Sequence, residues 1–133
     1  MLNELKDILE SLDETTGVVN AGVYYGICNR KDLDEWNYIV FNRKDTGKSG
    51  KTVAIGFSEY FEIHIVHEDY IPEGYVYDVI REVQKKSGQA GCKLRLTDDK
   101  ITYTYTQKPN TDIVMEIATI TFVHAMKDDV IRE

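Results

Sequence analysis

Cysteine and long apolar runs are scarce in this sequence, and each scarcity excludes a class of protein. The 133 residues include two cysteines, Cys28 and Cys92, whose wide separation excludes a CxxC metal or redox site. We expect both to be reduced thiols, because so sparse a use of cysteine is typical of cytoplasmic proteins. The longest apolar runs are a few residues, and charges interrupt the first turn, so we expect neither a membrane span nor a signal peptide.

A surplus of positive charge is also missing. The net charge is −7, with charged residues at 29% and hydrophobic residues at 42%. Because phosphate binding depends on lysine and arginine, this balance excludes a protein that grips nucleic acid through its whole surface. It fits a soluble globular chain, and it would also suit a surface past which DNA slides. The length suits a single domain over residues 1–133, large enough to bury a core without staples.

Patterns for catalysis and metal binding are absent too. His64 and His67 lie three residues apart in a predicted strand, which aims them at opposite faces, and His124 is distant in sequence. Neither cysteine has a histidine placed nearby to activate it, and no serine lies in a nucleophile elbow. Gly50-Lys51-Thr52 ends like a phosphate-binding loop, but Asp45 stands where that motif needs glycine, and no helix follows. We therefore expect no enzyme activity, no metal and no cofactor.

The longest regular pattern of the chain runs from Phe57 to Glu68. Apolar residues occupy alternate positions there, which is typical of a half-buried strand with Ile63 in the core. Pro72 follows at a corner, and apolar residues then recur at helical spacing, at Val76, Val79, Ile80 and Val83. The sequence thus predicts a long strand, a tight corner and an amphipathic helix as one packing unit.

Periodicity also divides the first part of the chain. An amphipathic helix is predicted over residues 3–14, and strands over residues 18–26 and 36–41. The stretch 42–56 is rich in glycine, serine and lysine and has no periodicity. We expect it to be a flexible loop.

After the long helix the pattern returns to strands. Residues 92–96 and 101–106 flank a polar turn and are predicted to form a hairpin, and residues 126–133 to form a charged tail. The predicted fold class is α+β, a largely antiparallel or mixed sheet with two helices packed on it, in the order α-β-β-β-α-β-β-β.

The final predicted strand, residues 113–124, is apolar on both sides. Such a strand is normally covered on both faces, and two helices can cover only one, so we expect a neighbouring subunit to cover the other. The tyrosines of the preceding strand are predicted to be core or interface residues, and the lysine-rich loop is available to dock a partner. The candidate interface residues are Arg43, Lys44, Lys48, Lys51, Tyr103, Tyr105, Val114, Ile120 and Phe122.

Three segments of the sequence resemble one known family. They are Glu35-Trp36-Asn37-Tyr38-Ile39-Val40-Phe41, His67-Glu68-Asp69-Tyr70-Ile71-Pro72-Glu73-Gly74 and Glu116-Ile117-Ala118-Thr119-Ile120-Thr121-Phe122. In this order and spacing they resemble the tail-completion or tail-terminator-like minor structural proteins of long-tailed, siphovirus-type bacteriophages and of prophages of Gram-positive bacteria. The resemblance spans most of the chain.

The resemblance implies a structural virion protein whose copies form a ring, usually a hexamer, at the head-proximal end of a tail tube. Such a homo-oligomer caps the finished tube and joins it to the head connector, so the implied partners are the tail tube protein and the head-tail connector protein. DNA passes through the ring only as cargo, and no membrane is involved. The implied location is the tail or neck of the virion, and the host cytoplasm during assembly.

Two alternatives stay open. One is a head-side connector or stopper subunit, which is a neighbouring role in the same particle. The other is a small nucleic-acid-binding module in which Lys44, Lys48 and Lys51 contact phosphates. Such a module would bind in a salt-sensitive way.

Overall fold

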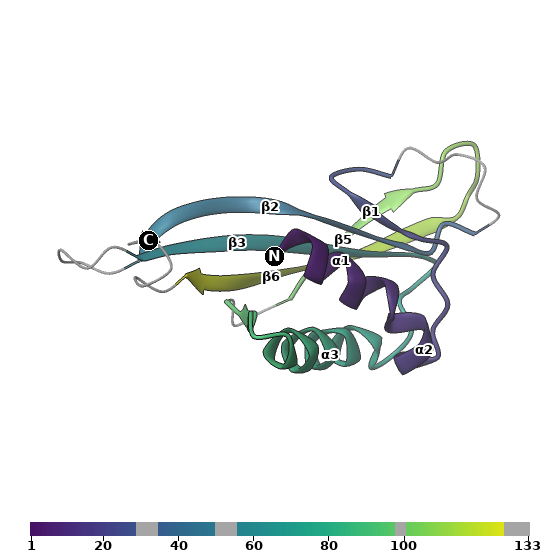
Figure 1. The fold of residues 1–133 in the computed structure, drawn as a ribbon. Helices are drawn as coiled ribbons and strands as arrows, with labels where there is room; N and C mark the ends of the chain where they lie inside the picture. The colour runs from purple at the N-terminus through teal and green to yellow at the C-terminus, as the bar shows by residue number, and fades with distance from the viewer. Residues whose placement is uncertain (29–34, 50–55, 98–100, 127–133) are drawn as a thin grey trace.

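The structure is a computed structural model and describes residues 1–28, 35–49, 56–97 and 101–126. Three helices gather on one side of a curved sheet (Figure 1). The elements in chain order are α1 (Leu2–Glu10), α2 (Leu12–Thr16), β1 (Val23–Tyr25), β2 (Tyr38–Ser49), β3 (Gly56–Glu68), α3 (Tyr75–Gln89), β4 (Arg95–Leu96), β5 (Thr102–Gln107) and β6 (Val114–Met126). The predicted α+β class is confirmed.

The strands form one mixed sheet in the order β1-β2-β3-β6, with β4 and β5 both paired to β6. Because β3 pairs with β6 from Met115 to Met126, the two short strands lie one after the other along the opposite edge of β6. β1 runs parallel to β2, and all other pairs of the described strands are antiparallel. The sheet therefore ends in β1 on one side and in β5 with β4 on the other.

The core lies between the helices and one face of the sheet. Ile63 at the centre of β3 pairs with Phe41 on β2 and with Ile120 on β6, and all three are buried. Burying side chains of this size stabilises the fold by about 1.5–3 kcal/mol each. The helices meet this face through leucines and valines, which are Leu5, Leu9, Leu12, Val76, Val79 and Val83. The predicted strand and helix of the central packing unit are thus confirmed, as β3 and α3.

The helix predicted over residues 3–14 is two helices in the structure, α1 and α2, which meet at Ser11. The Ser11 hydroxyl donates a hydrogen bond of 2.7 Å to the carbonyl oxygen of Ile8. Serine competes with helical backbone hydrogen bonding in this way. Periodicity does not reveal the break, because Leu12 keeps its place in the buried stripe. The described residues therefore hold three helices where two were predicted.

Much of the predicted loop over residues 42–56 is strand. β2 continues to Ser49, which pairs with Gly56 of β3, and residues 50–55 lie outside the described residues. Pairing with β3 outweighs the weak strand propensity of a stretch rich in glycine, lysine and aspartate. This end of the sheet extends beyond the helices (Figure 1).

The predicted hairpin of residues 92–96 and 101–106 does not form. Its two arms contain β4 and β5, which pair with β6 rather than with each other. Thr97 prolongs the contact of β4, since its N–H donates a hydrogen bond of 3.0 Å to the carbonyl oxygen of Thr121. β6 is 13 residues long, so its free edge accommodates both arms. The predicted final strand is confirmed as β6, and residues 127–133 of the predicted tail lie outside the described residues.

Candidate subunit interface

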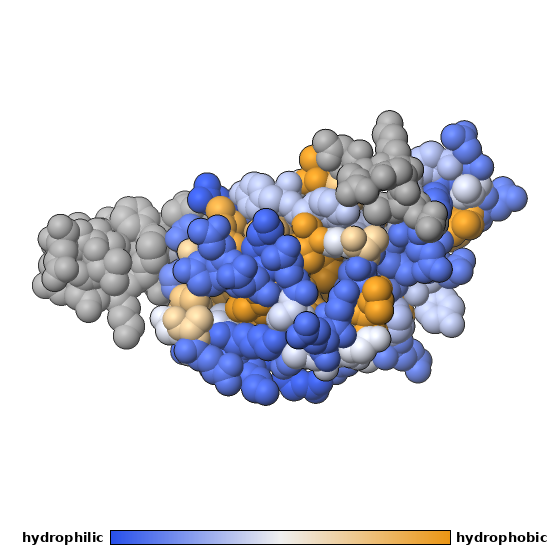
Figure 2. All heavy atoms as spheres, turned by 45° about the vertical axis from the view of Figure 1, so that its right-hand side comes forward, coloured by the Kyte–Doolittle hydropathy of each residue, from blue (hydrophilic) through white to orange (hydrophobic). Residues whose placement is uncertain are grey.

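Two kinds of feature are absent from the described part of the chain. Within residues 1–28, 35–49, 56–97 and 101–126, no three His, Cys, Asp or Glu side chains are grouped as metal ligands. No helix in these same segments is long and apolar enough to cross a membrane. Hydrophilic residues dominate the face drawn in Figure 2, and hydrophobic ones show in small separate groups. Exposed tyrosines lie instead at an edge of the sheet, on β5, at Tyr103 and Tyr105.

The two histidines of β3 point to opposite faces, as predicted. On the helix-free face, His64 Nδ1 lies 3.0 Å from Thr119 Oγ1 and Nε2 lies 3.2 Å from Asn42 Oδ1. On the helix-covered face, His67 is buried with its ring centroid 5.7 Å from that of Tyr75. Burial lowers the pKa of both rings, and nearby carboxylates offset only part of that effect. Both rings are therefore packed in their neutral form at neutral pH.

The β5 edge of the sheet is exposed along its whole length. All six residues of β5 are exposed, and among the described strands it pairs with β6 alone. Tyr103 keeps 42% of its surface exposed and Tyr105 keeps 63%. Residues 101–107 contain no charged side chain and no proline. Edge strands of soluble proteins normally carry lysine or proline that hinders pairing, and β5 lacks this protection.

Glu116 on β6 ties this edge to the corner before α3. One carboxylate oxygen accepts a hydrogen bond of 2.9 Å from the Tyr105 hydroxyl, and the other accepts one of 2.9 Å from the N–H of Ile71. The bond to Glu116 raises the pKa of the Tyr105 hydroxyl, which keeps it a donor. Beside this contact, Tyr77 and Tyr103 line a groove of about 330 Å³ between α3 and β5. Tyr105 is thus held in place at an exposed edge.

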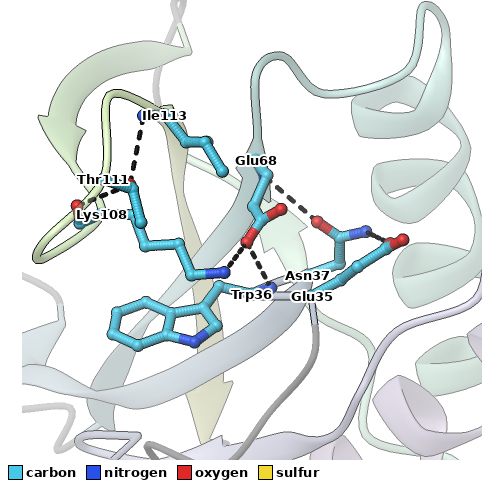
Figure 3. Close-up of polar contacts among 7 residues, drawn as sticks. All are labelled: Glu35, Trp36, Asn37, Glu68, Lys108, Thr111 and Ile113. Carbon is cyan, nitrogen blue, oxygen red and sulfur yellow. Dashed lines mark hydrogen bonds and ion pairs between the residues drawn. The ribbon is translucent and has the colours of Figure 1, made fainter.

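A second polar cluster fixes the turn between β5 and β6 (Figure 3). Glu68, at the end of β3, accepts hydrogen bonds from the Lys108 ammonium and from the N–H of Trp36, the latter at 3.1 Å. Lys108 Nζ also lies 5.4 Å from the centroid of the Trp36 ring, within cation–π range. Burial raises the pKa of the Glu68 carboxyl, but the bonds from Lys108 and Trp36 outweigh burial, so the pKa is lowered. The cluster anchors the β5–β6 turn to the start of β2.

The opposite edge of the sheet, at β1, is uncharged and exposed in part, since Tyr25 is exposed while Val23 and Tyr24 are half-buried. Among the strands that the structure describes, β1 pairs with β2 alone. Around it, the side chains of Val19, Tyr25 and Ile27 are 73%, 50% and 70% exposed. Residues 17–28 contain no charged side chain. We call these two surfaces the β1 edge (residues 17–28) and the β5 edge (residues 101–107 with Tyr77).

Three of the predicted interface residues lie at or next to the β5 edge. Tyr103 and Tyr105 are on β5 itself, and Val114, which is 48% exposed, begins β6 opposite Gln107. Of the predicted cations, Arg43 and Lys44 are exposed on β2. The first group forms one surface, and the cations lie elsewhere in the sheet.

Lys44 and Lys48 lie in the second half of β2. The ladder between β2 and β3 shifts register between Arg43 and Asp45, which leaves Lys44 as the extra residue of a β-bulge. Lys48 is on β2 and pairs with Phe57. Lys51 lies outside the described residues.

Ile120 and Phe122, also predicted as interface residues, belong to the core. They are 2% and 0% exposed beneath the helices, and they pair with Ile63 and Phe61 on β3. The sequence shows two apolar faces on β6 but not which of them the chain's own helices cover. A partner cannot reach either side chain without displacing a helix, so both are core residues and not part of the interface.

Sequence reasoning missed the β1 edge. Periodicity predicts a strand over residues 18–26, which the structure shortens to Val23–Tyr25, and it does not show that this strand ends the sheet. One signal was present in the sequence, the run from Gly17 to Cys28 without a charged residue. In a chain with 29% charged residues, such a run marks a surface that avoids charge.

Solved structures include chains that are similar to this one. No family model matches the chain, and no curated protein matches it. Among solved structures, it is similar to a chain of a structure described as the virion of a native gene transfer agent (GTA) particle. The two chains share 12% sequence identity with a TM-score of 0.48, over 92% of this chain and 91% of that one.

Proposed function

We propose that the chain is a structural protein of a phage-type virion, and more narrowly a tail-terminator or tail-completion protein. In this role its copies form a ring, a hexamer in the family that the sequence resembles, at the head-proximal end of the tail tube. The ring joins the tube to the head connector and lets DNA pass as cargo. The protein then acts without catalysis or a cofactor, in the tail or neck of the virion after assembly in the host cytoplasm.

The segments that carry the sequence resemblance meet at one place in the fold. They form the start of β2, the corner between β3 and α3, and the middle of β6, which are residues 35–41, 67–74 and 116–122. Glu68 joins the first segment to the second by accepting the N–H of Trp36. Glu116 joins the second to the third by accepting the N–H of Ile71. The resemblance therefore coincides with the contacts that position the β5 edge.

The observation that carries the proposal is the pair of uncharged edges at opposite ends of the sheet, the β1 edge and the β5 edge, neither of which has a further partner strand among the described residues. A subunit with two different free edges has two different surfaces for copies of itself. Contacts between unlike surfaces are heterologous, and they close into a ring when the rotation between copies allows it. At a net charge of −7 per copy, such a ring would repel DNA rather than hold it, as a conduit requires.

Binding to isolated tail tubes tests this function. Purified protein is mixed with uncapped tubes and examined by electron microscopy, while native mass spectrometry reports the number of copies in each assembly. We expect a closed ring at one end of each tube. Protein that stays monomeric and leaves the tubes bare would refute the proposal. Labelled protein found on isolated heads and not on isolated tails would instead favour the connector or stopper role.

A nucleic-acid-binding module is the second candidate, and the neighbouring exposed cations Arg43 and Lys44 favour it. It predicts DNA binding that weakens with salt and is lost when Lys44, Lys48 and Lys51 are replaced together by alanine. The triple variant and the wild type are compared by fluorescence anisotropy with a labelled duplex. Equal binding by the two proteins, or no binding by the wild type, rules this candidate out.

A further inference from the structure

We propose that neighbouring copies join by extending the sheet, with β5 of one copy pairing with β1 of the next in an antiparallel ladder. The inference rests on the proposed function only in requiring that copies meet side by side. It names the surface through which they meet. The occupant of each β5 edge is therefore the β1 edge of a second copy of this chain.

Strand directions make this pairing antiparallel. β1 runs parallel to β2, β3 runs opposite to both, and β6 runs in the direction of β2. β5 runs opposite to β6 and hence opposite to β1. When a second copy stands beside the first with its helices on the same side, β5 of one and β1 of the other run in opposite directions. Antiparallel pairing is the slightly more stable of the two kinds of ladder.

The two edges also lie at the same height in the sheet, meaning the same position along the direction of the strands. The register runs without a break from Val23 through Ile39, Ile65 and Ala118 to Tyr103. These residues share the helix-covered face, so Val23 and Tyr103 are the two ends of one row. A second copy placed alongside at the same height brings its Val23 next to Tyr103 of the first. The apolar row then continues across the junction.

The chemistry of the edges selects a second copy over a charged partner. Neither residues 17–28 nor residues 101–107 contain a charged side chain. Elsewhere the chain has a net negative charge, and the exposed side of α1 and α2 carries Glu4, Asp7, Glu10 and Glu14 beside Lys6. Copies with this charge repel one another when they approach through their helices. Approach through the two edges joins segments that carry no charged side chain of their own, and the carboxylate of Glu116 beside β5 already accepts hydrogen bonds from Tyr105 and Ile71.

The exposed side chains at the two edges are of the kinds that stabilise interfaces. Tyr77, Tyr103 and Tyr105 stand at the β5 edge, and Val19, Tyr25 and Ile27 stand at the β1 edge. Tyrosine is enriched among the residues that contribute most to protein–protein binding. The main chains supply backbone hydrogen bonds along the ladder, while the side chains supply apolar burial on its faces.

The junction is heterologous, because it uses two different edges. Each copy can therefore add a neighbour on both sides, and the twist of the sheet turns each copy relative to the last. The competing arrangement pairs β5 with β5 of a second copy. That contact is isologous, and it stops at a dimer.

Crosslinking between two single-cysteine variants separates the two arrangements. In a background with Cys28→Ser and Cys92→Ser, one variant carries Thr104→Cys on β5 and the other carries Ala21→Cys beside β1, both at exposed positions. A short bis-maleimide is added to each variant alone and to an equimolar mixture. We expect crosslinked dimers in the mixture and none in either variant alone. Crosslinking of the Thr104→Cys variant with itself would overturn the inference in favour of the β5–β5 dimer.

The same samples show whether the edge junction or the proposed tail role has failed. Oligomers seen by native mass spectrometry without a crosslink in the mixture would refute the edge junction and leave the tail role standing. Crosslinked assemblies that fail to bind tail tubes would support the junction and refute the tail role.

An added charge on β5 provides an independent test. Thr104→Lys places an ammonium group on the exposed edge without touching the core, and Gln89→Lys adds the same charge at an exposed residue at the end of α3. We expect Thr104→Lys to weaken self-association roughly tenfold or more, because an edge lysine hinders strand pairing. Gln89→Lys should leave association unchanged, and thermal melts should show both variants folded. Equal association of the two variants would overturn the inference.

Discussion

Glu68 holds three separate parts of the described structure together. Its side chain accepts hydrogen bonds from Trp36 N–H and from Lys108, while its own N–H donates one of 3.1 Å to Asn37 Oδ1. These contacts join the start of β2, the end of β3 and the β5–β6 turn. Glu68 therefore connects the core of the sheet to the β5 edge, although it contributes no surface to that edge.

Replacing Glu68 by glutamine should lower the free energy of unfolding by about 1.5–3 kcal/mol at neutral pH, the range for hydrogen bonds to charged groups. The folded pKa of Glu68 lies below its ordinary value of 4.5, so its contribution is complete above that pH and is lost as the pH falls through the folded pKa. Urea unfolding at a series of pH values measures this. The variant should lack part of the acid-induced loss that the wild type shows.

The matched control is Glu73→Gln, which removes an exposed carboxylate nearby. It should leave both the free energy of unfolding and its pH dependence within a few tenths of a kcal/mol, since surface substitutions away from specific contacts change little. Equal losses in the two variants would contradict the role assigned to Glu68.

His67 differs from Glu68, because it is a buried polar side chain with an unsatisfied ring nitrogen. Its Nε2 has no hydrogen-bond partner among the described residues, and the ring is 4% exposed against Tyr75. Because burial lowers its pKa from 6.5, the unfolded chain binds the proton more readily, and stability falls as the pH drops below 6.5 through the folded pKa. His67→Leu should be nearly neutral in stability at about pH 7.5 and should lose less stability than the wild type at about pH 5. Chemical unfolding at the two pH values checks this, and a variant that follows the wild-type pH dependence would contradict it.

At the scale of elements, β3 tests which face of the sheet is buried. Ile63→Asp should unfold the chain, because an unpaired buried charge costs several kcal/mol against a total stability of about 5–15 kcal/mol. Thr104→Asp puts the same carboxylate on exposed β5 and should leave the monomer folded. Circular dichroism melts of both variants give the comparison. An Ile63→Asp protein with an unchanged melting curve would mean that the faces of β3 are reversed.

Strands and helices that have a clear periodic pattern in their own local sequence were predictable. The alternation of β3 and the helical spacing of α3 are local patterns, and both appear at nearly their predicted positions. Residues 42–49 were predicted as loop because their strand conformation comes from pairing with β3, which local sequence does not encode. β4 and β5 were predicted to pair with each other for the same reason, because the edge that they share belongs to β6, later in the chain.

The candidate interface was predictable only in part. Tyr103 and Tyr105 were singled out because they share one face of a strand, and that strand lies at the sheet's edge. Ile120 and Phe122 were indistinguishable from interface residues in sequence, because burial by the chain's own helices and burial by a neighbour require the same side chains. The β1 edge needed the sheet order, which no pattern in residues 17–28 supplies.

At the scale of the whole molecule, the net charge opposes association, and the two edges carry none of that charge. The chain has a net charge of −7, yet the β1 edge and the β5 edge contain no charged residue. Two copies therefore repel each other at long range and attract only through apolar and backbone contacts at short range. Salt acts on the first of these interactions and little on the second.

Self-association should therefore strengthen when the salt concentration rises from about 50 mM to about 500 mM. At the higher concentration the charge repulsion between copies is screened over a distance shorter than ~10 Å. Sedimentation velocity at the two concentrations measures the weight-average mass, which we expect to increase with salt. The nucleic-acid alternative predicts the opposite sign for binding to DNA, since ion release weakens such complexes as salt rises. Association that weakens with salt would instead point to ion pairs between copies, with Arg43 and Lys44 of one copy against the acidic residues of α1 in another. That result would move the interface from the sheet edges to the hairpin, because only a charged junction loses strength when its charges are screened.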